Sequence, residues 1–153
     1  MTYSTRFARR NVQLRLISFA DIDTYVYIDE LAGLSLSDVK AFALDPDVAV
    51  RRLAALSDWN IDANLQRTLC TDPDESVVLT LLSRIDPSVE MCDLIIVGPH
   101  VDARRTIARR NLMADILRRL ANDDDRITAE MARATLAARG AAVDQDESSP
   151  VRT

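Results

Sequence analysis

The sequence predicts an all-α fold, a right-handed α-solenoid of four to five short helix-turn-helix repeats. One observation is a turn that recurs roughly every 25 residues, a period typical of helical repeat proteins, at Asp45, Asp72, Gly98 and Asp123. A second is that apolar residues recur at helical spacing before the turns, as in Leu112, Ile116 and Leu120. The third is composition: 48% apolar residues, many of them Ala and Leu, with only 3 glycines, favour close helix packing over a β-sandwich.

Each repeat is predicted to consist of one helix, a tight turn and a second helix. The first helices are predicted at residues 36–44, 61–71, 89–97 and 112–122. Asp45 and Asp72 are predicted to cap the second helix, with the proline that follows each of them at the first helical position. Gly98 is predicted to end one helix and Pro99 to begin the next. Because one such pair cannot bury its apolar face alone, the repeats are expected to stack.

The N-terminal part is the least regular. A weaker copy of the turn begins at Asp21, so residues 1–34 are interpreted as a degenerate repeat or cap. The alternation of apolar residues within 12–28 also allows a β-hairpin. Helices are favoured there because the register of the later turns continues back to Asp21.

The C-terminal end is predicted to leave the repeat pattern. The final helix is expected to run from Asp124 to about Arg139, with Gly140 ending it. Residues 141–153 are polar, contain no large aliphatic cluster and are predicted to be disordered. The sequence therefore predicts one helical-repeat domain over residues 1–140 and a tail.

The turn and the helix after it resemble a known repeat family. The pattern, an Asp-Pro-Asp turn before a helix rich in Val and Arg, is similar to the leucine-rich repeat variant family and its HEAT-like relatives over roughly residues 12–139. The residues that carry the resemblance are Asp45, Pro46, Asp47, Val50, Arg51, Asp72, Pro73, Asp74 and Val77. The resemblance implies a superhelix of stacked helices and no activity. The clustered cysteines of that family's iron–sulfur segment have no counterpart in this sequence, so no cofactor is expected.

Charge and cysteine usage limit the classes of partner. The formal net charge is −5, which disfavours nucleic acid as a partner because affinity there depends on neutralising phosphates. Lys40 is the only lysine, a bias interpreted as that of a GC-rich bacterial or phage genome. Two isolated cysteines, Cys70 and Cys92, indicate reduced thiols and a cytoplasmic protein. No apolar run approaches the ~20 residues of a membrane span.

Arginines at equivalent repeat positions are the strongest candidate site. Arg51 and Arg52 occupy the same position relative to their turn as Arg104 and Arg105. They are interpreted either as a docking surface for an acidic partner or as ion pairs with turn aspartates of neighbouring repeats. In the intervening repeat this position holds Val78 and Leu79, which would form an apolar contact patch if exposed and core if buried. The predicted partner-binding residues are Arg51, Arg52, Val78, Leu79, Arg104 and Arg105.

Other polar and aromatic residues have simpler explanations. Trp59, the only tryptophan, is either a binding anchor or a residue packed over the end of the core. His100, the only histidine, cannot by itself form a metal site or a catalytic triad. The acidic run 123–125 lies at a helix start, where negative charge is favourable, and matches no calcium-loop spacing. No catalytic, metal-binding or cofactor-binding residue is predicted.

The sequence therefore favours a non-enzymatic protein–protein interaction module, an adaptor, regulator or inhibitor that binds a protein through an extended repeat surface. Self-association into a homo-oligomer is a further expectation. One alternative is a DNA-binding or DNA-repair protein, because HEAT-like DNA glycosylases use a helical solenoid. Another is a phage or prophage accessory protein that targets a host protein.

Overall fold

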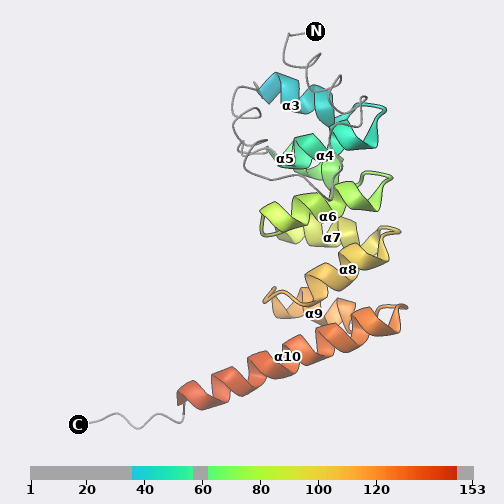
Figure 1. Cartoon of the computed structure of the whole chain (residues 1–153). Coiled ribbons are helices and arrows are strands. Elements are labelled where there is room, and N and C mark those ends of the chain that lie inside the picture. Colours follow the sequence, from blue (N-terminus) through green and yellow to red (C-terminus); the bar gives the residue numbers. More distant parts are fainter. Residues whose placement is uncertain (1–35, 57–61, 148–153) are drawn as a thin grey trace, which may run out of the picture. The chain divides into compact units, whose positions relative to one another are not determined.

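The computed structural model describes residues 36–56 and 62–147, and all regular secondary structure in these ranges is α-helical (Figure 1). The prediction of an all-α protein is confirmed for this part of the chain. By packing, the chain divides into two compact units, residues 1–86 and 87–153. The two units are described separately below. The segment 12–28 and Trp59 lie outside the described ranges.

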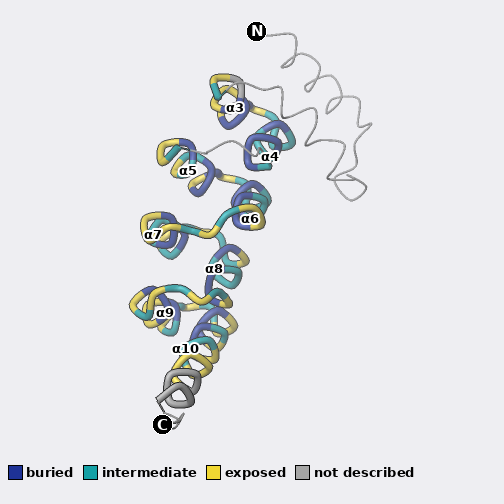
Figure 2. Tube along the Cα trace, turned by 90° about the vertical axis from the view of Figure 1, so that its left-hand side faces the viewer, coloured by how far each residue is buried: buried dark blue, intermediate teal, exposed yellow. Residues whose placement is uncertain are grey.

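The described residues of unit 1, 36–56 and 62–86, form two helix pairs. The first pair is α3 (Leu36–Ala43) and α4 (Val48–Leu56), and the second is α5 (Ala63–Cys70) and α6 (Glu75–Arg84). Helix α3 packs against α4 and α5, while α6 packs against α4 and α5. The first helices thus form one layer of the unit and the second helices form another, as Figure 2 shows.

Unit 2 repeats this arrangement. Its pairs are α7 (Val89–Val97) with α8 (Val101–Ala108), and α9 (Ala114–Leu120) with α10 (Arg126–Glu147). Helix α7 packs against α8 and α9, and α10 packs against α8 and α9. The first helices, α7 and α9, again lie side by side, as do the second helices, α8 and α10 (Figure 2).

The core of each unit is built from equivalent positions of the repeat. The third residue before each turn is buried, in Phe42, Leu69, Ile95 and Leu120. So is the ninth residue after each turn, in Ala54, Leu81, Ile107 and Ala132. One position therefore comes from the first helix and the other from the second, which places apolar surface on the facing sides of the two layers.

The turns between paired helices are longer than predicted. Asp45 and Asp72 do not cap the second helices; their carboxylates accept the backbone N–H of the second aspartate, at 2.9 Å for Asp47 and 2.8 Å for Asp74. That second aspartate is the cap: Asp74 accepts the N–H of Ser76 at 2.9 Å. The first aspartate is engaged in an Asx turn, so the prolines sit inside the turn rather than at the first helical position.

The third turn differs in the same way. Gly98 ends α7 as predicted, but Pro99 does not begin α8. His100 occupies the N-cap position, and the helix starts at Val101. The physical reason is the same: a turn residue and a proline must reverse the chain before helical backbone geometry is established.

Helix α10 corrects the predicted C-terminus. It continues through Gly140 to Glu147, so Gly140 does not end it. A single glycine costs a helix only about 1 kcal/mol relative to alanine, and it ends a helix when it adopts the left-handed conformation. Gly140 has no such backbone conformation, and its flanking alanines favour helix.

Candidate functional site

Arg51 of α4 connects two turns within unit 1. Its Nε and Nη2 donate to the two carboxylate oxygens of Asp72, at 2.7 and 3.1 Å. Its Nη1 donates to the backbone carbonyl of Asp45 at 2.9 Å. The side chains of Arg51 and Asp72 are only 13% and 3% exposed, so this ion pair lies largely inside the unit.

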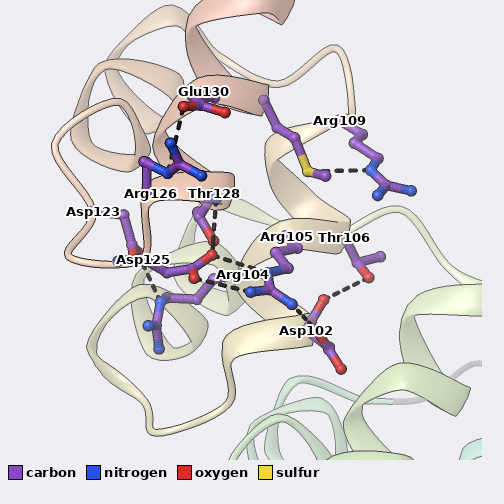
Figure 3. A network of polar contacts seen from close by, with 11 residues as sticks. Asp102, Arg104, Arg105, Thr106, Arg109, Asp123, Asp125, Arg126, Thr128 and Glu130 are labelled. Carbon is purple, nitrogen blue, oxygen red and sulfur yellow. Dashed lines mark hydrogen bonds and ion pairs between the residues drawn. The ribbon is translucent and has the colours of Figure 1, made fainter.

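Arg104 of α8 makes the equivalent contacts within unit 2 (Figure 3). Its Nε donates to Asp123 at 2.7 Å and its Nη1 to the carbonyl of Gly98 at 2.9 Å. The two side chains are 12% and 7% exposed. In both units, an arginine of one repeat therefore binds its own turn through a carbonyl and the next turn through a carboxylate.

Arg105 forms a second contact of this kind (Figure 3). Its Nε and Nη2 bind both carboxylate oxygens of Asp125 at 2.9 Å, and its Nη1 binds Asp102 at 2.9 Å. The Arg105 guanidinium, followed by the hydrogen bonds from Thr128, holds the pKa of the Asp125 carboxyl well below its usual range. The carboxylate is thus charged in the folded protein at any ordinary pH.

Arg52 occupies the corresponding position in unit 1. Burial lowers the pKa of its guanidinium, and the negative charge of Asp74 partly opposes that effect. Asp74 has a lowered pKa, first through its hydrogen bonds from Ser76 and then through the positive charges of Arg51 and Arg52. The second aspartate of the turn is therefore electrostatically coupled to the arginines of the repeat before it.

The residues at the equivalent position of α6 are apolar, and only one of them reaches the surface. Val78 is fully buried, whereas Leu79 is partly exposed. Of the two alternatives for this pair, Val78 therefore follows the core one, whereas Leu79 is partly accessible to a partner. The turn between α7 and α8 carries Gly98 and His100 where other turns carry aspartates.

The arginines at repeat positions are engaged within the units. The interpretation as ion pairs with turn aspartates of neighbouring repeats is confirmed for Arg51, Arg104 and Arg105. The guanidinium groups of Arg51 and Arg104 are too buried to form an exposed ridge. Binding of a partner by the six predicted residues stays a prediction, and Leu79 and Arg105 are partly exposed members of that set.

A different group of arginines is not among the six predicted partner-binding residues. Arg109, Arg133 and Arg139 are exposed and donate to neutral acceptors. Within the described residues, no carboxylate lies within ion-pair distance of these three side chains. In the sequence these three arginines differ from the paired arginines in their position after the turn. That position does not show which acceptor each arginine meets.

The remaining candidates are explained by structure. The aspartates of the run 123–125 include a turn residue, Asp123, and the ion-pair partner Asp125. Cys92 is buried in unit 2, and burial raises the pKa of its thiol to about 11. Residues 36–56 and 62–147 contain no group of three or more His, Cys, Asp or Glu side chains that could hold a metal ion. No helix in these ranges combines the length and apolar character of a membrane span.

Comparison with known proteins found no match, whether to a protein-family model, to a curated protein or to a solved structure.

Proposed function

We propose that the chain is a helical-repeat protein of the HEAT-like, solenoid type and that it acts as a non-enzymatic protein-interaction module. The observation that carries this proposal is the repeated arginine–aspartate contact between consecutive turns. It links one helix pair to the next in unit 1 through Arg51 and Asp72, and in unit 2 through Arg104 and Asp123. Such links favour regularly spaced second helices, and repeat proteins present surfaces of this kind to other proteins.

The buried ion pairs also indicate what the charged residues do. Taking two charges out of water is expensive, and a buried pair often contributes little net stability. Its better attested role is to specify one arrangement over others. The repeated pairs are therefore expected to set the register of neighbouring helix pairs, which a binding surface made from several repeats requires.

Leu79 offers a direct test of the predicted contact face. It is partly exposed and occupies the position that holds arginine in two other repeats, so Leu79→Arg should be accommodated by the fold. Ser83→Arg, at an exposed position of the same helix, adds the same charge and serves as the control. Both variants should retain the helicity and melting temperature of the parent protein.

The experiment is capture from a bacterial lysate with each full-length protein as bait, followed by titration of the purified partner by calorimetry. We expect one protein to bind the parent chain and the Ser83→Arg variant, and to bind the Leu79→Arg variant about tenfold or more weakly. Failure of the parent chain to bind any protein directly would refute the proposed function. Equal binding by all three baits would remove Leu79 from the contact face.

A further inference from the structure

Eight arginines of unit 2 fall into two groups according to the acceptor that each side chain meets. Those of the first group contact carboxylates: Arg104, Arg105, Arg118, Arg119 and Arg126. Arg109, Arg133 and Arg139 instead contact a thioether sulfur and two backbone carbonyls. The contacts of the second group hold the side chains in place and leave their positive charges uncompensated within the described residues.

Two members of the second group are associated with one loop. Arg109 begins the loop between α8 and α9, and Arg139 of α10 donates from Nη1 to the carbonyl of Leu112 in the same loop, at 2.6 Å. Leu112 follows Arg109 by three residues, a span of at most about 11 Å. Thr135 Oγ1 donates to the carbonyl of Ala108 at 2.8 Å, which holds the start of the loop against α10. Arg109, Arg139 and the loop 109–113 are referred to below as the α8–α9 corner.

The geometry of the α8–α9 corner leaves donors available. Arg109 uses Nε for its contact with the Sδ of Met131 at 3.2 Å, and Figure 3 shows its terminal nitrogens on the side away from the sulfur. Thioether sulfur is a weak acceptor, and a guanidinium has five N–H donors. Both arginines are exposed, so their remaining donors face solvent. Each guanidinium group held in this way suits a carboxylate, which it can bind with paired hydrogen bonds.

The chemistry of the corner favours an acidic polypeptide over nucleic acid. Two arginines neutralise few phosphates, and nucleic-acid affinity increases with the number neutralised. The net charge of −5 for the whole chain further opposes a long polyanion. A short acidic segment presents its carboxylates locally and needs only a local positive surface. Side chains already held by Leu112 and Met131 also lose less conformational freedom when a ligand binds.

We propose that the α8–α9 corner binds an acidic polypeptide segment through Arg109 and Arg139. This inference rests on the proposed function, because it names the class of partner and a site for it. It differs from the predicted contact face, whose residues belong to α4, α6 and α8. The two arginines would anchor the acidic segment. Their neutral acceptors position the guanidinium groups and leave the positive charges available.

The test is a fluorescence anisotropy titration of a labelled polyglutamate peptide with the full-length protein at low ionic strength. The variant is Arg109→Gln/Arg139→Gln. The matched control is Arg118→Gln/Arg126→Gln, which removes two exposed arginines of the same unit that contact the carboxylates of Asp115 and Glu130. Both variants change the net charge equally, and circular dichroism checks that both retain the helicity of the parent.

We expect the parent protein to bind polyglutamate and not polyglutamine. The Arg109/Arg139 variant should bind about tenfold more weakly, and the control variant should change by about twofold or less. Equal weakening in both variants would show an effect of net charge alone and overturn the site. Absence of binding by the parent protein would overturn it as well.

Two further results separate this inference from other possibilities. Single-stranded DNA that binds more tightly than polyglutamate, and through the same two arginines, would assign the corner to nucleic acid and overturn the acidic-polypeptide proposal. A protein partner that binds the parent chain while polyglutamate does not would leave the proposed function intact and refute only the α8–α9 corner. Failure to bind either a protein partner or polyglutamate would refute the proposed function and the α8–α9 corner together.

Discussion

Arg51 and Arg104 perform the same task in different repeats, and each does so against a carboxylate with little access to water. The side chains of Asp72 and Asp123 are 3% and 7% exposed. A buried carboxylate without its guanidinium partner is an uncompensated charge, which destabilises a protein far more than loss of a surface pair does. These arginines are therefore residues that the fold requires.

Substitution of Arg104 tests this requirement. Arg104→Val should lower the free energy of unfolding by about 3 kcal/mol, because the Asp123 carboxylate stays buried without its guanidinium partner. Arg126→Val removes an exposed ion pair in which Arg126 Nε lies 3.8 Å from Glu130 Oε1. This substitution should change the free energy of unfolding by about 0.5 kcal/mol or less. Urea denaturation followed by circular dichroism measures both values. Similar values for the two variants would contradict a structural role for the Arg104 contact.

Removal of both members of the Arg104–Asp123 pair is the second half of this experiment. Arg104→Val/Asp123→Gly should recover part of the stability lost in Arg104→Val, because the buried carboxylate is removed with its partner. The double-mutant cycle should therefore show a coupling energy of about 1 kcal/mol or more. Strictly additive effects would show that the contact contributes nothing beyond its separate side chains.

Asp125 predicts how the protein responds to acid. Its folded-state pKa is depressed below the ordinary value of 3.8, so the folded protein binds the proton more weakly than the unfolded chain. The stabilisation from this group is therefore present above pH 3.8 and is lost as the pH falls below it.

Asp125→Asn should make the unfolding free energy less sensitive to pH below about pH 4, because its contribution no longer titrates. Asp115→Asn is the control, because that carboxylate is 82% exposed and pairs only at the surface. Denaturant midpoints measured across acidic pH give the comparison. A pH dependence that is unchanged in Asp125→Asn would assign the acid sensitivity to other carboxylates.

Among the helices, α10 differs most from the others. Figure 1 shows it continuing past α9, whereas the other described helices are short. Its first turns pack on α8 and α9, and residues 137–140 are exposed. The position of Gly140 within this exposed stretch allows the helical extension to be tested directly.

Gly140→Ala should stabilise the extension by up to about 1 kcal/mol. An added Cβ would meet nothing within 4 Å, so the substitution changes helix propensity without a steric cost. Circular dichroism should show increased helicity, and amide hydrogen exchange should show slower exchange in residues 141–147. Reduced helicity would indicate that the glycine ends the helix in a left-handed conformation, as the sequence alone suggested.

The whole molecule is acidic, with 24 carboxylate and 19 cationic side chains. The net charge opposes general attraction to phosphates. We therefore expect no measurable binding to duplex DNA at physiological salt. Anisotropy titration of labelled DNA over a range of salt concentrations checks this. Tight binding that weakens steeply with salt would revive the DNA-binding alternative.

The sequence alone predicted the local features of the chain. Helix positions followed from apolar spacing and turns from Asp, Pro and Gly, because both depend on neighbouring residues along the backbone. The predicted first helices overlap the observed α3, α5, α7 and α9. The errors at Pro46, Pro73 and Pro99 concern a few residues at helix starts, where side-chain hydrogen bonds of the turn decide the boundary.

Only the tertiary structure decided which polar side chains are engaged and which remain available. Arg51 meets Asp72 across 21 residues of sequence, and Arg139 meets Leu112 across 27. Contacts over such separations depend on how neighbouring helices pack. The same packing buries Val78 and leaves Leu79 partly exposed, although the two residues are adjacent in the sequence. The sequence thus showed which repeat position each arginine occupies. Packing between helices determined the acceptor that each arginine meets.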